Sequence, residues 1–364
     1  MSLVPNHIKN LLRYKAGKPI EEVKRELGLK NVIKLASNEN PLGPSKKAIK
    51  AIEESLQEVS LYPDSNGFYL RQKLAEIFAL DIENVVLGAG SEGIMATIMR
   101  TFLNDSDCIL ATKNSFIGFR VLANASGKKV DWVPMKNYAY NLDAMADAIH
   151  GKTKIIYLAN PDNPTGSYFN KDKFDNFIAK VPSRCLVILD EAYYEYASFL
   201  EDYPDSMSYR YDNVITLRTF SKSYGLAGLR VGYGFAHKNL IANLMKVKLP
   251  FEPSIPAQVA AMAALEDESH IKKTLKITLE QMKKLEETLK NLKIEYIPSS
   301  ANFITLILKG EEEAKMFTHK FLENGVILRH LDSFGLPEAV RVTIGKESDM
   351  KCFTHNLKTI LEHA

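Results

Sequence analysis

The chain has 364 residues, of which 46% are hydrophobic and 25% are charged, a composition typical of a globular protein with a sizeable core. The formal net charge is only +3 and no long basic block occurs, which argues against nucleic acid as the main partner. The sequence contains neither a signal-peptide-like apolar segment nor an apolar run of about 18 residues, so we expect no membrane span and a cytoplasmic location.

The first part of the chain divides into an arm and a large domain. Residues 1–40 combine a short amphipathic piece with the beginning of the loop "SNENPLGPS", and we expect an arm there that packs with the small domain or acts as a lid. Within residues 41–250, seven short apolar runs alternate with helical patterns, which predicts an α/β fold with a mostly parallel seven-stranded sheet covered by helices. The expected strands are 85–87, 108–112, 128–135, 154–160, 185–190, 213–220 and 230–236.

A proline cluster, "LPFEPSIP" at 249–256, marks the boundary to the last part of the chain. A helical pattern then runs from about 257 to 292, and the remainder is expected to form strand, strand, helix, strand, strand and helix. We therefore expect residues 251–364 to form a smaller α+β domain that begins with a long helix.

The stretch "VVLGAGSEG" places Gly88, Gly90 and Gly93 after an expected strand and before an expected helix. This spacing is typical of dinucleotide binding, but the next strand ends in Thr112 rather than in an acidic residue. A helix N-terminus also binds the phosphate of other molecules, because its free amides and its dipole favour an anion. The segment alone leaves open a phosphate site or a turn without a ligand.

Three further stretches decide between these alternatives. They are "NPDNPTG" at 160–166, "LVILDEAYYEY" with Asp190, and "TFSKSYGLAGLRVG" at 219–232 with Lys222. Each follows an expected strand, and ligands of open α/β sheets bind beyond the carboxyl ends of the strands. A phosphate cradle, a hydrogen-bond donor, a carboxylate and an amine are together the groups that hold pyridoxal 5′-phosphate.

With these motifs in this order, the chain resembles the fold-type I pyridoxal-phosphate aminotransferases over nearly its whole length. Within that class it is most similar to the histidinol-phosphate aminotransferases. The resemblance rests on "LLRYKAG", "ASNENPLGPS", "YPD", "DEAYYEY", "GVILRH" and "AVRVTIG". It implies amino transfer between histidinol phosphate and 2-oxoglutarate, which gives imidazole acetol phosphate and glutamate.

The resemblance implies catalytic roles for three residues, Lys222, Asp190 and Tyr193. Lys222 would form the Schiff base with the cofactor and move a proton between the substrate and the cofactor. Asp190 would keep the ring nitrogen protonated, and Tyr193 and Asn163 would hydrogen-bond the 3′-oxygen. The groups implied for the cofactor phosphate are the backbone amides of Gly90, Ser91 and Glu92, the hydroxyls of Thr219 and Ser221, and the guanidinium of Arg230.

Two aromatic residues complete the implied cofactor site. Phe116 stands where the family usually has a tyrosine on the ring, so stacking is kept and a hydroxyl contact is lost. Tyr62 resembles the residue that reaches the cofactor phosphate of the neighbouring subunit, which implies a homodimer with shared active sites.

The implied substrate contacts are Asn38, Asn163, Arg329, Arg341 and Tyr14. Arg341 aligns with the arginine that receives the anionic group of the substrate, and Arg329 adds a second cation. Two cations suit the phosphate of histidinol phosphate, while glutamate can use the same site in the other half-reaction.

Alternative functions remain open at this point. Within the cofactor class they are an aminotransferase for aromatic or other amino acids, and a decarboxylase of a phosphorylated amino acid. A nicotinamide oxidoreductase and a ligand-sensing module are alternatives from other classes. No histidine falls in the strand-end motifs, and the three cysteines are far apart, so we expect reduced thiols and no metal.

Overall fold

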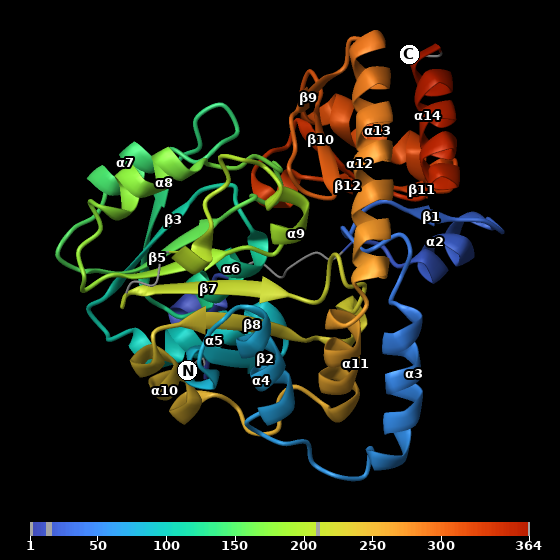
Figure 1. Ribbon diagram of the computed structural model, residues 1–364. Coiled ribbons are helices and arrows are strands. Elements are labelled where there is room, and N and C mark those ends of the chain that lie inside the picture. Colours follow the sequence, from blue (N-terminus) through green and yellow to red (C-terminus); the bar gives the residue numbers. More distant parts are fainter. Residues whose placement is uncertain (1–2, 12–16, 209–211, 363–364) are drawn as a thin grey trace.

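The computed structural model describes residues 3–11, 17–208 and 212–362 (Figure 1). Its centre is a seven-stranded sheet in the order β2-β8-β7-β6-β5-β3-β4, in which only β8 runs antiparallel to its neighbours. This confirms the predicted mostly parallel sheet. The strands are β2 (Val85–Gly88), β3 (Cys108–Thr112), β4 (Lys129–Val133), β5 (Thr153–Ala159), β6 (Leu186–Asp190), β7 (Val214–Thr219) and β8 (Gly232–Ala236).

Helices cover both faces of this sheet because its strands are apolar on both sides. In β3, Ile109 packs into one core cluster and Leu110 into the cluster on the opposite face, as alternation along a strand requires. The first face carries α5 (Gly90–Phe102), α6 (Ile117–Ala125) and α10 (Lys238–Val247). The second carries α3 (Lys46–Ser55), α4 (Phe68–Ile77), α7 (Leu142–Asp147), α8 (Lys171–Ile178) and α11 (Ile255–Leu265).

The C-terminal part has its own sheet and its own core. Four antiparallel strands in the order β12-β13-β10-β9 pack against α12, α13 and α14, and Figure 1 shows α12 standing between the two parts of the molecule. The elements are α12 (Glu268–Asn291), β9 (Glu295–Ile297), β10 (Phe303–Ile307), α13 (Glu311–Glu323), β11 (Val326–Ile327), β12 (Arg329–His330), β13 (Ala339–Thr343) and α14 (Glu347–Glu362).

The continuous helix expected from about 257 to 292 is wrong, because the structure divides this stretch into α11 and α12. The break falls at Glu266 and Asp267, where the Asp267 side chain caps α12 by accepting a hydrogen bond from the backbone N–H of His270. The two helices also pack in different cores. Alanines of α11 pack against α3 and α4 beside the large sheet, whereas α12 contributes leucines to the C-terminal core.

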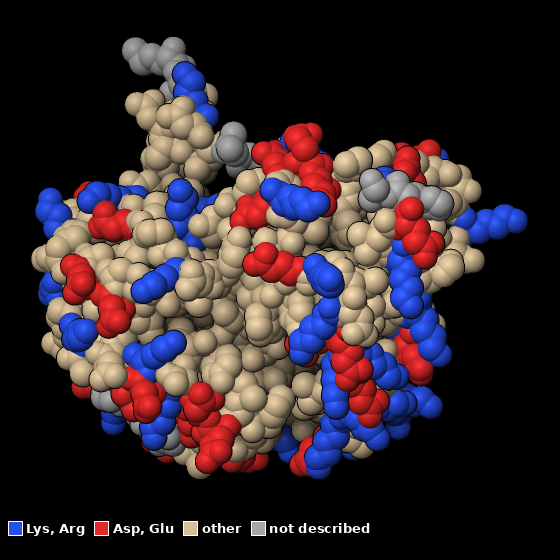
Figure 2. Space-filling view, turned by 90° about the horizontal axis from the view of Figure 1, so that it is seen from above, with Lys and Arg blue, Asp and Glu red and all other residues tan. Residues whose placement is uncertain are grey.

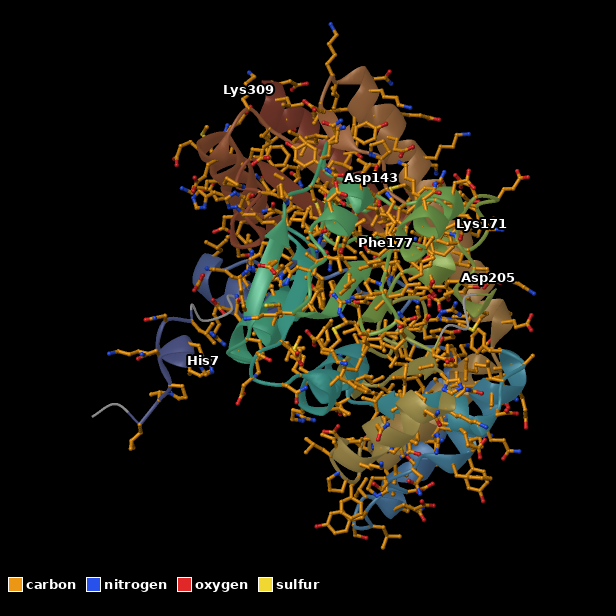
Figure 3. All side chains as sticks on the ribbon, turned by 90° about the vertical axis from the view of Figure 1, so that its left-hand side faces the viewer. His7, Asp143, Lys171, Phe177, Asp205 and Lys309 are labelled. Atoms are coloured by element: carbon orange, nitrogen blue, oxygen red, sulfur yellow. The ribbon has the colours of Figure 1, made fainter. Side chains whose placement is uncertain are left out.

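The N-terminal arm contacts the C-terminal part through strand pairing. It comprises α1 (Asn6–Lys9), α2 (Ile20–Leu27) and β1 (Ile33–Lys34), and β1 pairs in parallel with β11. Figure 3 shows α1, with His7, on a segment that projects from the body.

On the face seen in Figure 2, positive and negative side chains are intermingled. Among the described residues, no helix is both long enough and apolar enough to cross a membrane. Short helical turns complete the fold: α9 (Tyr194–Ala197), η1 (Leu56–Glu58), η2 (Ile82–Asn84), η3 (Ser206–Ser208), η4 (Ala227–Leu229) and η5 (Asp332–Phe334).

Candidate active site

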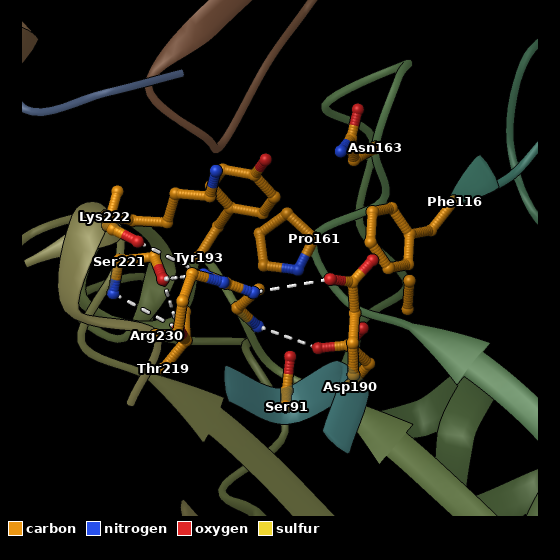
Figure 4. A pocket seen from close by; sticks show the side chains of 14 residues that line it. Ser91, Phe116, Pro161, Asn163, Asp190, Tyr193, Thr219, Ser221, Lys222 and Arg230 are labelled. Atoms are coloured by element: carbon orange, nitrogen blue, oxygen red, sulfur yellow. Dashed lines mark hydrogen bonds and ion pairs between the residues drawn. The ribbon is translucent and has the colours of Figure 1, made fainter. Parts of the chain in front are cut away.

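A cavity of about 240 Å³ lies at the carboxyl edge of the large sheet. Strands β2, β5, β6 and β7 end at this edge, and β8 begins there because it runs in the opposite direction. Figure 4 shows Lys222, Tyr193 and Asp190 among the side chains that converge on the cavity. Its walls are Ser91, Glu92, Phe116, Ala159, Pro161, Asn163, Asp190, Ala192, Tyr193, Thr219, Ser221, Lys222, Ala227 and Arg230.

Lys222 follows β7, and its amine is the only lysine nitrogen in the cavity wall as the structure describes it. The Nζ atom lies 3.5 Å from the carbonyl oxygen of Ser37 and 5.7 Å from the ring centroid of Tyr193. Desolvation, together with the positive charges of Arg341 and Arg230, lowers the pKa of Lys222 to about 8. About a tenth of this amine is therefore neutral and nucleophilic at pH 7, far more than for a lysine of ordinary pKa.

Asp190 ends β6 and is 4% exposed. Its carboxylate accepts a hydrogen bond of 2.8 Å from the hydroxyl of Tyr157 and one of 3.2 Å from the backbone N–H of Ala192. Burial raises the pKa of Asp190 to about 7, although both hydrogen bonds oppose this rise. A buried carboxyl with such a pKa favours a cationic partner, because a nearby positive charge stabilises its ionised form.

The end of the cavity opposite to Asp190 offers hydrogen-bond donors and a positive charge to an anion. Helix α5 begins at Gly90 and directs its free amides there. Arg230 Nη1 lies 3.4 Å from Ser221 Oγ, and Arg230 Nη2 lies 3.3 Å from Glu92 Oε2. Gly90 does not line the cavity, but it has a φ of +73°, and a Cβ at this position would lie 2.7 Å from Arg230 Nη2. Because Gly90 has no side chain, the guanidinium of Arg230 has room to lie beside the start of α5.

Residues from the arm and the C-terminal part act on the cavity indirectly, through hydrogen bonds to residues that line it. Asn38 Nδ2 donates to the hydroxyl of Tyr193 over 2.9 Å, and Arg341 Nη1 donates to Asn163 Oδ1. Arg341 also donates to the carbonyl of Ala36 over 2.9 Å. Burial raises the pKa of Tyr193 to about 12, so this hydroxyl stays protonated. Neither Asn38 nor Arg341 lines the cavity, but each contacts a residue that does.

Arg329 and Arg341 face each other on neighbouring strands. They are directly paired in the β12–β13 register, and their exposed fractions are 9% and 5%. Arg329 Nη2 lies 3.2 Å from the hydroxyl of Ser333. Neither guanidinium lines the cavity, but the pair places two positive charges behind Asn163, which Arg341 contacts and which does line it.

Tyr62, which was expected to serve a cofactor site, does not line the cavity of its own chain. Tyr62 is 80% exposed and stacks on Phe251 at a centroid distance of 4.3 Å, away from the cavity of its own chain. Tyr14 lies outside the described residues, so its expected phosphate contact stays a prediction.

Sequence reasoning missed Tyr157 and Asp162. Tyr157 lies in the middle of β5, where a buried hydroxyl requires a partner, and this requirement was the available signal. Asp162 is the variable residue of "NPDNPTG", and its role depends on partners that are distant in sequence.

One group of described side chains has metal-ligand chemistry. Single ligand atoms of Cys108, Asp131 and His150 lie within 4.8 Å of one another. However, His150 Nε2 lies 2.8 Å from Asp131 Oδ2, and His150 Nδ1 accepts the Lys152 N–H, so the proton belongs on Nε2. Lys129 also neutralises Asp131 over 2.7 Å. These contacts favour a hydrogen-bonded ion pair, and the absence of a metal stays a prediction.

Comparison with known proteins identifies the family. Residues 30–357 match the model of the aminotransferases of class I and II. A histidinol-phosphate aminotransferase of Moorella thermoacetica is 42% identical over 97% of this chain and 92% of its own. A second one, from Carboxydothermus hydrogenoformans, is 39% identical over 99% of each chain. The chain belongs to the class I and II aminotransferase family.

Solved structures show the same fold. The histidinol-phosphate aminotransferase of Sinorhizobium meliloti, crystallised with pyridoxal 5′-phosphate, superposes with a TM-score of 0.92, covering 100% of this chain and 98% of its own at 24% identity. The aspartate aminotransferase of Thermotoga maritima gives a TM-score of 0.85 at 20% identity and covers 99% of this chain and 100% of its own. At these identities the likeness establishes the fold, which is that of the fold-type I aminotransferases.

Proposed function

We propose that this enzyme transfers the amino group of histidinol phosphate to 2-oxoglutarate, giving imidazole acetol phosphate and glutamate, as a step of histidine biosynthesis. The curated relatives of about 40% identity carry the name of this activity. The observation that carries the proposal is the pair Arg329 and Arg341, two buried guanidinium groups on facing strands beside the cavity. A phosphate with close to two negative charges suits two cations, and each can bind it in a bidentate manner.

The cavity fits pyridoxal 5′-phosphate as the cofactor. At one end the α5 amides, two hydroxyls and Arg230 offer donors for a phosphate. At the other end the Asp190 carboxyl, with its pKa raised to about 7, suits a protonated ring nitrogen. Phe116 supplies an aromatic face, and the Lys222 amine lies in the same cavity. The donor set therefore matches the three chemical groups of this cofactor, its phosphate, its ring and its aldehyde.

When bound, the cofactor supplies an aldehyde that accepts amino groups and a ring that withdraws electrons from the substrate α-carbon. Lys222 Nζ would act as the base that removes the proton from this carbon, since its lowered pKa leaves about a tenth of it neutral at pH 7. Asp190 would hold a proton on the ring nitrogen, and Tyr157 fixes the orientation of the carboxylate. Tyr193 and Asn163 would donate hydrogen bonds to the 3′-oxygen, while Asn38 orients the Tyr193 hydroxyl.

The active form is proposed to be a homodimer with shared sites. Tyr62 is exposed outside its own cavity, as a residue that serves a neighbouring site must be. It belongs to a set of large apolar side chains that are exposed in the single chain, a feature typical of a subunit interface. The set includes Leu56, Val59, Leu61, Tyr62, Phe68, Tyr69, Leu249 and Phe251. A cytoplasmic location stays a prediction.

A substrate panel tests the proposal. The purified enzyme, supplied with pyridoxal 5′-phosphate and 2-oxoglutarate, is offered histidinol phosphate, histidinol, phenylalanine and aspartate, and glutamate formation is measured. We expect kcat/KM to be highest for histidinol phosphate and at least tenfold lower for histidinol, which lacks the phosphate. Efficient use of phenylalanine without use of histidinol phosphate would contradict the proposed substrate but not the aminotransferase class.

A further inference from the structure

Asp162 is a fully buried carboxylate in the turn that follows β5. It does not line the cavity, but the residues on either side of it, Pro161 and Asn163, both do. Its backbone N–H and carbonyl are already used by the turn, in bonds to Ser167 and Gly166 of 2.8 and 2.9 Å. The side chain is therefore available for contacts with other parts of the site.

The Asp162 carboxylate joins two loops that form opposite parts of the cavity wall. Its Oδ1 accepts a hydrogen bond of 2.5 Å from the hydroxyl of Ser115, the residue before Phe116. Its Oδ2 accepts bonds from the hydroxyl and the backbone N–H of Thr165 at 2.8 and 3.3 Å, within the turn that carries Asn163. One carboxylate thus fixes the position of Phe116 relative to that of Asn163.

The network extends behind the cavity to β5. Ser115 Oγ lies 2.8 Å from the hydroxyl of Tyr140, which accepts the backbone N–H of Ala159 over 3.0 Å. Ala159 lines the cavity and pairs in register with Asp190. The carboxylate, the serine and the tyrosine therefore connect Phe116 to the strand ends that carry the other groups of the site.

Burying a carboxylate is unfavourable unless hydrogen bonds compensate for the loss of water. Desolvation raises the pKa of Asp162 to about 6, and the bonds from Ser115 and Thr165 act in the opposite direction. A turn alone does not require a charge here, because short polar side chains close such turns as well. The groups that donate hydrogen bonds to this carboxylate, Ser115 and Thr165, both belong to loops that line the cavity. The unfavourable burial of the charge is therefore offset by contacts that organise the site.

We propose that Asp162 is a positioning residue that holds the ring-stacking Phe116 and the amide of Asn163 in fixed relation to each other around the cofactor. This inference rests on the proposed function, because it assigns the two held residues to the ring face and the 3′-oxygen of pyridoxal 5′-phosphate. Asp162 itself does not touch the reacting atoms and acts only through its partners.

The test compares Asp162→Ala, Asp162→Asn and Ser115→Ala with the wild type and with Asp172→Asn, a control at an exposed position of α8. Three quantities are measured: the Kd of pyridoxal 5′-phosphate for the apoenzyme, the pH midpoint of the visible absorption band of the holoenzyme, and kcat and KM separately. We expect Asp162→Ala to weaken cofactor binding about tenfold, to move the band midpoint and to lower kcat more than it changes KM. Asp162→Asn should restore part of each effect, since it keeps one acceptor.

The effect of the double variant Asp162→Ala/Ser115→Ala should fall clearly short of the sum of the two single effects, because both changes remove the bond between Ser115 and Asp162. Additive effects, or a lower melting temperature with unchanged Kd, band midpoint and kcat, would overturn the inference. If Asp162→Ala does not fold, Ser115→Ala and Asp162→Asn decide by the band midpoint, and no shift in either one refutes the role. A wild-type protein without a cofactor band would refute the proposed function, and this inference with it. A normal wild-type band with unaffected variants refutes only the inference.

Discussion

Tyr157 donates a hydrogen bond to Asp190 across neighbouring strands, with 2.8 Å between the two oxygens. The bond favours the ionised form of Asp190, so it lowers the pKa of a carboxyl that burial raises to about 7. The Tyr157 hydroxyl therefore helps to set the charge of Asp190, the carboxyl proposed to face the ring nitrogen of the cofactor.

Replacement of Tyr157 by phenylalanine should shift the acid limb of the pH profile upward. Without the hydroxyl, the pKa of Asp190 rises further, so less of the carboxylate is ionised at pH 7 and kcat/KM falls there. We expect a shift of up to about one pH unit, measured as kcat/KM between pH 5.5 and 9. Tyr233→Phe is the matched control, because the buried Tyr233 hydroxyl has no hydrogen-bond partner in the described part of the chain. An equal shift in both variants would count against the role of Tyr157.

Capture of pyridoxal 5′-phosphate by the apoenzyme should accelerate with pH through about 8. The amine of Lys222 attacks only when neutral, and its pKa is lowered from 10.5 to about 8. At pH 7 the rate should be about a tenth of its plateau value, as one unit below the pKa implies. Stopped-flow absorbance over pH 6 to 10 measures this rate. A midpoint near 10.5 would show that burial does not perturb this lysine.

Lys222→Arg should abolish turnover even though it keeps the positive charge. A guanidinium stays protonated at all accessible pH values, so it provides neither a nucleophile nor a base. We expect kcat to fall at least about a thousandfold, a loss comparable to that of an essential general base. Borohydride reduction followed by peptide mass analysis should label position 222 in the wild type alone. Labelling of another lysine would reassign the site.

Arg329→Gln should discriminate between substrates with and without a phosphate. Loss of one charge-assisted hydrogen bond of about 1.5–3 kcal/mol corresponds to a decrease of roughly 10- to 100-fold in kcat/KM for histidinol phosphate. Turnover of histidinol should change little. Arg25→Gln, an exposed change of the same charge in α2, is the control. Equal losses for both substrates would mean that Arg329 supports the fold rather than the phosphate.

Loss of one partner of the buried pair Arg218 and Glu191 should strongly destabilise the large sheet. The two partners lie 2.9 Å apart and both side chains are at most 1% exposed. Arg218→Met leaves a buried charge and should lower the free energy of unfolding by about 3–5 kcal/mol, whereas Arg218→Met with Glu191→Leu should recover most of it. Lys272→Met, in an exposed pair with Glu268, should change stability by less than about 1 kcal/mol. Denaturant melts of the holoenzyme measure these differences.

The sheet could be predicted because each of its strands has a recognisable apolar pattern in its own local sequence. Each of the seven apolar runs forms a strand, and Lys222, Asp190 and Asn163 fall beyond strand ends, where topology brings them together. The break between α11 and α12 was not predicted, since helical patterns stand on both sides of Glu266 and the cap is a single aspartate.

Contacts between segments that are distant in the sequence also could not be predicted from local sequence patterns. Nothing within "NPDNPTG" indicates that Asp162 meets Ser115, 47 positions earlier in the chain. The bond between Asn38 and Tyr193 likewise depends on how the arm crosses the finished fold. Such contacts require the packed structure, because pairing across long sequence separations is decided by the fold as a whole.

The reversed direction of β8 concentrates the chemistry in one short stretch of chain. Because β7 ends and β8 begins at the same edge, the segment from Thr219 to Gly232 leaves the sheet and returns to it around the cavity. It carries the hydroxyls, the amine and the guanidinium together. An insertion or deletion there would displace all of these groups at once, so this loop has little freedom to vary in length.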